Sequence, residues 1–355
     1  MTSAFINAIG TATPGQDIHR AFIDWAAARI DDPRARALFT RMADRSGIAH
    51  RWSVLPATEA GGSPVAAGGF YADPVLPGTA ARMTLYAEHA PDLALSAIAA
   101  LGAGVDHTIT HLVVASCTGF VAPGIDQIIA ARLGLPGNVE RLLVGFMGCY
   151  AAVAALRQAR HIVRSDPTAR VLVVTVELST LHLQDTQEIE PLLAMLQFGD
   201  GAAAAIVTTE PHGLEIGETF AATLPDSDRL ITWDIGDQGF AMGLSGEVPG
   251  RIAAALADPA VRDVVTGGRD PATIDGWAVH AGGRSILDAV AHALALDQEA
   301  LAPSRAVLDA FGNMSSATLM FVLARILAGP PLSDGVALAF GPGLAAEGFA
   351  FASAP

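Results

Sequence analysis

The stretch Arg141-Leu-Leu-Val-Gly145-Phe-Met-Gly-Cys149-Tyr-Ala-Ala-Val153 joins a short apolar run to an alanine-rich segment. The run at its start is too short for a helix and apolar on both faces, which favours a strand buried between two layers. Over residues 151–163 the apolar side chains recur at three- and four-residue spacing, which predicts a helix. The thiol of Cys149 therefore stands at a corner between a strand and a helix.

The same alternation of strand and helix recurs along the chain. Further apolar runs of strand length are residues 111–115, 171–176 and 336–340, and helical spacing returns at residues 286–294 and 317–327. Strands that alternate with helices indicate an α/β fold built of layers.

An interruption at Pro211-His-Gly213 divides this pattern, and residues 224–249 follow with weaker periodicity. We predict two α/β halves, residues 1–210 and residues 211–355, packed as one body. Residues 54–78 are rich in glycine, proline and alanine, which predicts surface loops.

The composition argues against several classes of protein. The 355 residues carry a net charge of −15, whereas a general nucleic-acid binder needs a basic face to neutralise phosphates. No apolar run reaches the roughly 18 residues of a membrane span, and the N-terminus lacks the basic start of a signal peptide. Cys117 and Cys149 form no CxxC pair, so we expect a cytoplasmic protein with two free thiols.

Two other strand-to-helix corners carry a polar residue at the position that Cys149 occupies in the first corner. His280 follows the run Trp277-Ala-Val and precedes two glycines, and Asn313 precedes a helical segment. A thiol at a helix N-terminus forms a thiolate more readily, and an imidazole can hold that thiolate as an ion pair. The N–H groups of His280 and Asn313 would stabilise the oxyanion formed when a malonyl thioester loses carbon dioxide. The set predicts acyl transfer without a metal ion.

Each of these residues also has an ordinary structural explanation. A single cysteine is often a small buried apolar residue, and an asparagine before a helix is often its N-cap. The three residue types also occur in Cys-His-Asn proteases, although strand-to-helix corners fit that class poorly. The repeated position favours a joint catalytic role, but the residues by themselves leave the catalytic and structural interpretations about equally supported.

At these corners the chain resembles the type III polyketide synthases, the chalcone-synthase-like family. The resemblance covers nearly the whole length, and its most specific motifs are Gly312-Asn-Met-Ser-Ser316 and Phe340-Gly-Pro-Gly-Leu344. The motif Phe198-Gly-Asp-Gly-Ala202 and the His280-Ala-Gly-Gly283 corner agree with it. Other matching stretches begin at Ile9, Arg41, Thr110 and Gly119.

The resemblance implies a thiolase-like fold with two similar α/β halves in the layer order αβαβα. It also implies an acyltransferase that holds an acyl-CoA starter as a thioester on Cys149, with His280 and Asn313 as the other catalytic residues. Malonyl-CoA would extend the starter in repeated decarboxylative condensations, and cyclisation would follow. A fatty acyl starter and an alkylpyrone, alkylresorcinol or related product are expected, and no cofactor beyond the CoA thioesters is implied.

Other proteins of this fold remain as alternatives. The nearest is a ketoacyl carrier-protein synthase III, which shares the three residues but performs a single condensation. A protein that binds acyl-CoA without condensing it is disfavoured by the intact set of three residues. A thiolase proper is disfavoured because no second catalytic cysteine stands near the C-terminus.

The resemblance also assigns residues to the substrate pocket. Phe198 and Met242 match two gate positions between a CoA tunnel and the cavity, and the plant enzymes carry phenylalanine at the second of them. Trp233 stands where the plant enzymes carry glycine, which adds bulk to the cavity wall. These departures make a plant-type flavonoid product unexpected. The remaining pocket positions are Cys117, Thr118, His182 and Ser315.

For the CoA substrate, the resemblance assigns Arg41 and Arg45 to the nucleotide phosphates. Arginine suits phosphate oxygens because its planar fork is always charged. A third basic position of the plant enzymes is Leu38 here. Gly282 and Gly283 match a loop along the pantetheine arm.

The resemblance further implies a homodimer in which each subunit holds a complete site. The residue that approaches the partner's cavity is expected near Ala122. The starter, the number of extensions and the choice between lactone and aldol closure are left open, because they depend on cavity volume and ordered water.

Overall fold

The computed structural model describes residues 2–57, 63–102 and 105–355. In these residues nine strands form one mixed sheet in the order β11-β12-β13-β8-β1-β7-β6-β4-β5. The strands are β1 (Phe5–Ala12), β4 (His111–Ser116), β5 (Glu140–Gly145), β6 (Val171–Leu178), β7 (Asp200–Thr208), β8 (Leu214–Thr223), β11 (Gly276–Val279), β12 (Gly335–Gly341) and β13 (Ala345–Ser353). Short antiparallel pairs are formed by β2 (Gln16–Asp17) with β3 (Trp52–Ser53), and by β9 (Ile231–Gly236) with β10 (Gly239–Leu244).

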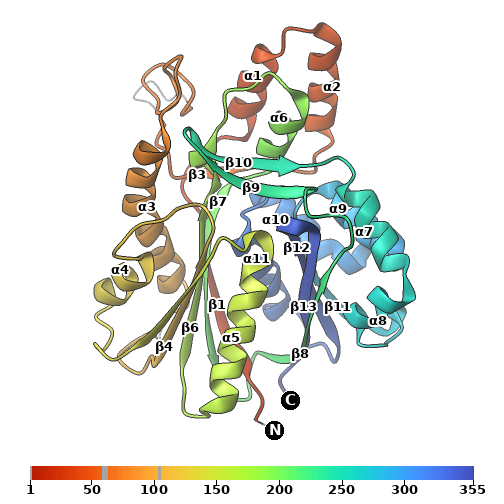
Figure 1. Cartoon of the computed structure of the whole chain (residues 1–355). Helices are drawn as coiled ribbons and strands as arrows, with labels where there is room; N and C mark the ends of the chain where they lie inside the picture. The colour runs from red at the N-terminus through yellow and green to blue at the C-terminus, as the bar shows by residue number, and fades with distance from the viewer. Residues whose placement is uncertain (1, 58–62, 103–104) are drawn as a thin grey trace.

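The sheet has two parts, which β1 and β8 join through two residue pairs, Phe5 with Glu215 and Ile6 with Leu214. Helices α5 (Ala151–Ser165) and α11 (Ser316–Leu327) lie between the two parts and contact strands of both (Figure 1). Outer helices cover the other face of each part. They are α3 (Thr79–Ala99) and α4 (Ile125–Arg132) on the first part, and α7 (Val248–Ala257), α8 (Pro259–Thr266), α9 (Arg284–Ala293) and α10 (Ala302–Phe311) on the second.

This arrangement confirms the predicted layer order αβαβα. Three clusters of buried apolar side chains fill the spaces between the layers, one around α5 and α11 and one under each outer group of helices. Every residue of β6 and β12 is buried, because helices pack on both faces of these strands. The strands predicted at residues 111–115, 171–176 and 336–340 and the helices predicted at 151–163, 286–294 and 317–327 are all present.

A separate group of elements closes one end of the layers. Helices α1 (His19–Arg29), α2 (Pro33–Asp44) and α6 (Ile189–Met195) lie at that end, above the β9–β10 hairpin (Figure 1). The hairpin falls in residues 224–249, where the sequence showed weak periodicity. The described residues of 54–78 form no helix or strand, as predicted, yet Leu55, Tyr71 and Leu76 within them are buried.

The structure corrects one prediction about the strands. We expected β5 to be buried on both faces, but it is an edge strand that pairs with β4 on one side. Its residues Leu142 and Leu143 are each 42% exposed. No described helix is long and apolar enough to cross a membrane.

Candidate active site

The turn that carries Cys149 is shaped by a second loop of the chain. Cys149 lies in the short 3-10 turn Gly148–Tyr150, between β5 and α5. Gly148 has φ +71°, and a Cβ added there would lie 2.3 Å from the Pro342 ring. A Cβ added at Gly341 would lie 3.3 Å from the Cys149 nitrogen and closer still to the Tyr150 ring. The C-terminal Phe-Gly-Pro-Gly-Leu motif is therefore a tightly packed support for the cysteine turn.

Asn313 links the other two corners of the site. Its amide nitrogen Nδ2 donates to the Gly282 carbonyl at 3.2 Å, two residues beyond His280. Its oxygen Oδ1 accepts from the Ser315 N–H at 2.8 Å, which fixes the orientation of the amide. The Asn313 backbone is held by Gln197 and Gly199, on either side of Phe198. The second amide hydrogen of Asn313 is directed to the Cys149 sulfur, the position at which a substrate would be held.

Cys149 is buried beside these groups and is protonated in this arrangement. Its sulfur lies 3.8 Å from the Ser315 hydroxyl. Burial raises the pKa of Cys149 to about 12, although hydrogen bonding from Ser315 and Asn313 acts in the opposite direction. The helix N-terminus was predicted to favour the thiolate, and loss of water contact outweighs that effect here.

His280 is buried and neutral. Burial lowers its pKa to about 3, and neither ring nitrogen has a hydrogen-bond partner among the described residues. Transfer of the Cys149 proton to His280 would create two opposite charges, and a buried pair of this kind is favourable only in close contact. The ion pair predicted from the sequence remains a prediction, and the unpartnered ring nitrogens leave His280 able to bind a substrate oxygen.

A buried carboxylate behind the cysteines was missed by the sequence analysis. Glu177 accepts hydrogen bonds from the Cys117 N–H at 3.0 Å, from the Thr118 hydroxyl at 2.9 Å and from the Ser316 hydroxyl. Burial raises the pKa of Glu177 to about 7, and these hydrogen bonds limit the rise. The available signal was a glutamate inside the otherwise apolar run Val171–Leu178, since such a residue needs several donors.

Substitution of Glu177 by glutamine is expected to stabilise the protein at pH 8. A carboxyl group with a raised pKa keeps its proton in the folded state at a pH where the unfolded chain has lost it. Glu177 therefore lowers the free energy of unfolding increasingly as the pH rises from about 4.5 to above 7. Glutamine stays neutral: its oxygen can accept from the Cys117 N–H and the Thr118 hydroxyl, and its NH₂ can donate to the Ser316 oxygen. The change should raise the free energy of unfolding at pH 8 by roughly 2–3 kcal/mol. Thermal unfolding at pH 5 and pH 8 measures this, and an equal change at both values would contradict it.

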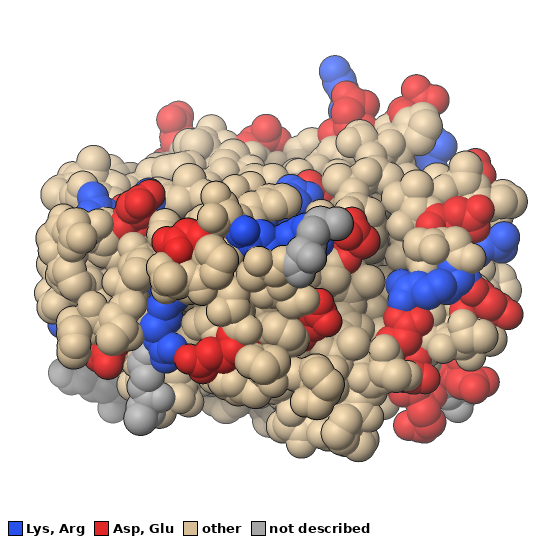
Figure 2. Space-filling model, turned by 90° about the horizontal axis from the view of Figure 1, so that it is seen from below, with Lys and Arg blue, Asp and Glu red and all other residues tan. Residues whose placement is uncertain are grey.

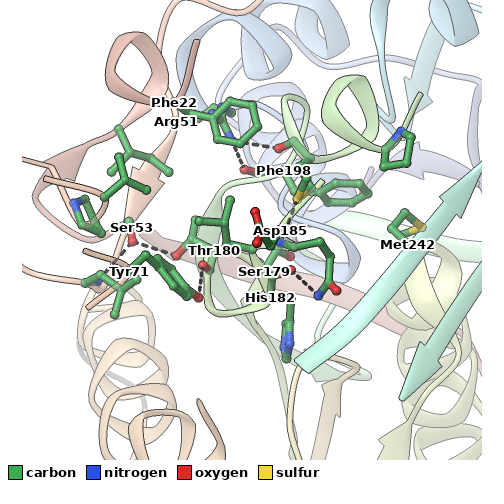
Figure 3. Close-up of a pocket in the computed structure, with 18 of the residues that line it drawn as sticks. Phe22, Arg51, Ser53, Tyr71, Ser179, Thr180, His182, Asp185, Phe198 and Met242 are labelled. Atoms are coloured by element: carbon green, nitrogen blue, oxygen red, sulfur yellow. Dashed lines mark hydrogen bonds between the residues drawn. The ribbon is translucent and has the colours of Figure 1, made fainter. Parts of the chain in front are cut away.

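The structure places four of the seven predicted pocket residues around one cavity of about 310 Å³ (Figure 3). His182, Phe198, Trp233 and Met242 line it, together with mostly apolar side chains of α1, α6 and β10, and with Leu55 and side chains of residues 63–71. Cys117, Thr118 and Ser315 do not line it, and neither do Cys149, His280 and Asn313.

Trp233 forms the boundary between the cavity and Cys117. Its indole N–H donates to the Cys117 carbonyl at 2.8 Å, and its ring packs edge-on against His182 and Phe240. Trp233 is therefore part of the wall of this cavity, and its predicted role in shaping the substrate site stays a prediction. Cys117 itself faces the cysteine turn, where its sulfur accepts from the Gly148 N–H at 2.9 Å.

His182 is fixed as a neutral imidazole in the cavity wall. Its Nε2 donates to the Thr118 carbonyl at 2.8 Å, and its Nδ1 accepts from the Phe240 N–H at 3.0 Å. Burial lowers the pKa of His182 to about 3, and its ring stacks on Phe240 with centroids 4.3 Å apart. Both nitrogens are occupied, so His182 shapes the cavity and has no free nitrogen for proton transfer.

The arginines predicted to meet CoA phosphates lie on the surface of α2. Arg41 and Arg45 are exposed and line an open depression of about 520 Å³. The predicted pantetheine loop is packed tightly from behind, since a Cβ added at Gly283 would lie 2.2 Å from Gln197 Oε1. This contact favours a glycine at position 283 for packing, in addition to the predicted role of Gly283 along the pantetheine arm.

Comparisons with known proteins agree along the whole chain. The N-terminal domain of chalcone and stilbene synthases matches residues 1–211, and the C-terminal domain matches residues 215–355. The alpha-pyrone synthesis polyketide synthase-like Pks18 of Mycobacterium tuberculosis is 32% identical over 365 residues, covering 99% of this chain and 91% of that protein.

Solved structures agree as well. The C-terminal type III polyketide synthase domain of Steely1, a type I/III hybrid from Dictyostelium, matches with a TM-score of 0.89 and 26% identity, over 99% of this chain and 100% of that chain. PKS-I of the brown alga Ectocarpus siliculosus matches with a TM-score of 0.87 and 30% identity, over 99% of each chain. This chain therefore belongs to the chalcone and stilbene synthase family, the type III polyketide synthases, which are acyltransferases that condense malonyl-CoA iteratively onto an acyl-CoA starter.

Proposed function

We propose that Cys149 carries the acyl chain and that His280 and Asn313 form the decarboxylation site. The observation that carries this assignment is the position of Asn313, which contacts the Cys149 thiol and also bonds the loop that follows His280. Asn313 thus links the cysteine turn to the loop that follows His280, and each of the three residues supplies a different chemical group.

In the proposed loading step, the Cys149 proton passes to His280 as the sulfur attacks the starter thioester. The new carbon–sulfur bond forms on Cys149, the bond to the CoA sulfur breaks, and CoA leaves with a proton from His280. Malonyl-CoA then loses carbon dioxide, and N–H groups of His280 and Asn313 stabilise the enolate oxygen that remains. The enolate carbon attacks the acyl group on Cys149 and forms the carbon–carbon bond, while the bond from the acyl carbon to the Cys149 sulfur breaks and the thiolate leaves. The extended chain, now a CoA thioester, can return to Cys149 for the next extension.

We propose a fatty acyl starter and an α-pyrone product. The cavity beside Phe198 and Met242 is lined mostly by apolar side chains, which suits an alkyl chain. Two of the polar side chains that line it, Ser53 and Tyr71, are hydrogen-bonded to Thr180 (Figure 3). The α-pyrone ring is suggested by the name of the relative Pks18.

A product assay tests this proposal. Purified protein is incubated with malonyl-CoA and a panel of short, long and aromatic acyl-CoA starters, and products are identified by mass spectrometry. Products with two or more extender units from long-chain starters, with the mass of a lactone, support the proposal. A preference for aromatic starters would contradict the proposed fatty acyl starter. A product mass that shows loss of carbon dioxide by aldol closure would contradict the proposed α-pyrone.

We further propose a homodimer that forms along the edge of the sheet. Leu142 and Leu143 on β5 are 42% exposed, and Phe120 beside the end of this strand is 46% exposed. An unpaired apolar edge strand invites pairing with another chain. Ala122, predicted to approach the partner's cavity, is exposed close to Phe120.

Replacement of Leu143 by arginine is expected to convert the dimer to a monomer, because a charge would enter the centre of this interface. Size-exclusion chromatography with light scattering measures the mass. Val264 on α8, which is 44% exposed, offers a matched control as Val264→Arg and should leave the mass unchanged. A monomeric wild-type protein would refute the proposal.

A further inference from the structure

One face of α2 combines exposed apolar and basic side chains. Leu38 and Met42 are 38% and 45% exposed, and Arg34, Arg41 and Arg45 are exposed beside them. At 3.6 residues per turn these five side chains fall within an arc of about 100° around the helix axis. The opposite side of the helix is held to the protein by buried Phe39 and Ala43.

The basic residues of this face are not neutralised by the rest of the chain. Among the described residues, no salt bridge or side-chain hydrogen bond involves the guanidinium groups of Arg34, Arg41 or Arg45. These three side chains therefore give the face a local positive charge in a protein whose net charge is −15. At the end of the molecule away from α2, in contrast, arginines lie next to acidic residues (Figure 2).

The end of α2 is connected to the proposed active site. Arg284 Nη1 donates to the Arg45 carbonyl at 3.3 Å. Arg284 directly follows Gly283 and Gly282, and the Gly282 carbonyl accepts from Asn313. The C-terminal end of α2 therefore lies next to the loop between His280 and α9.

CoA by itself uses only part of this face. Its phosphates would pair with Arg41 and Arg45, but a nucleotide gives no reason for exposed Leu38 and Met42, and Leu38 replaces a basic residue that would add a further phosphate contact. A protein donor would use both kinds of side chain, since interfaces combine apolar contacts with complementary charge.

We propose that the Arg34–Arg45 face of α2 docks an acidic carrier protein that delivers the starter acyl group on a phosphopantetheine arm. This inference rests on the proposed loading of Cys149 and adds a second donor for the same step. Negative side chains of the carrier pair with the three arginines, and an apolar side chain of the carrier packs on Leu38 and Met42. Malonyl-CoA remains the extender.

The chemistry of loading is the same for either donor. The Cys149 sulfur forms a bond to the acyl carbon, the bond from that carbon to the pantetheine sulfur breaks, and the carrier thiol leaves with the proton that His280 received from Cys149. No further reactant is required.

The test compares three donors of one decanoyl group: an acidic acyl carrier protein, CoA and free pantetheine. Intact-protein mass spectrometry follows acyl transfer to Cys149 without malonyl-CoA. We expect the carrier to load the enzyme at least about tenfold faster than pantetheine at equal concentration. The double variant Leu38→Gln/Met42→Gln should lose most of that advantage while loading from CoA changes less than about twofold. Val264→Gln, an exposed change on α8, should alter neither rate.

Four other results would contradict the inference. A carrier no faster than pantetheine would overturn it, as would a double variant that slows all three donors equally. Binding of the wild type to anionic lipid vesicles that the double variant loses, with carrier loading unchanged, would assign the face to a membrane surface instead. Failure of all three donors to load Cys149 would overturn the proposed function, and the inference with it.

Discussion

Replacement of Cys149 by alanine is expected to abolish acyl loading and to lower product formation on the order of 10⁴-fold or more. The sulfur is the proposed point of attachment for the acyl chain, so no other group can hold the starter while malonyl-CoA is decarboxylated. Intact-protein mass spectrometry after incubation with an acyl-CoA measures the loading, and liquid chromatography with mass spectrometry measures the product.

The second cysteine gives a matched control. Cys117 follows β4 and faces the turn that carries Cys149, where its sulfur accepts from the Gly148 N–H, and its carbonyl accepts from the Trp233 indole. Cys117→Ser should retain loading and change the product distribution before the rate. Full product formation by Cys149→Ala, or complete loss of activity in Cys117→Ser, would reverse the assignment of the two thiols.

The sequence was sufficient for the layers of the fold because its signals there are local. Buried strands such as β6 have no exposed face, and the alanine-rich α5 shows helical spacing, so each could be assigned from a few residues. The exposed edge of β5 could not be predicted, because its apolar sequence looks the same as that of a strand buried on both faces.

The sequence was less informative about the environment of the site. Three corners predicted the reactive groups, but not that burial would raise the pKa of Cys149 and lower that of His280. Those shifts depend on how much water the folded chain excludes, which no motif encodes. The same limit applies to Glu177, whose donors come from two segments far apart in the sequence, Cys117–Thr118 and Ser316.

Replacement of Asn313 by alanine is expected to lower decarboxylation of malonyl-CoA by about 10²- to 10³-fold while loading of Cys149 falls much less. The Asn313 amide is proposed to stabilise the enolate oxygen, and that charge develops only after carbon dioxide begins to leave. Release of labelled carbon dioxide from malonyl-CoA measures decarboxylation, and acyl transfer to Cys149 measures loading.

Two further variants separate this role from packing. Asn313→Asp keeps the oxygen that accepts from the Ser315 N–H but loses the amide hydrogens, including the bond to the Gly282 carbonyl, so it should decarboxylate as poorly as Asn313→Ala. Thermal unfolding of both variants reports any loss of packing separately from the loss of decarboxylation. Cys149→Gln lacks the nucleophile and keeps the pair of His280 and Asn313, so it should still release carbon dioxide from malonyl-CoA. If Asn313→Asp decarboxylates at the wild-type rate, the enolate is not held by this amide, and His280 with its two unpartnered nitrogens must stabilise that charge without it.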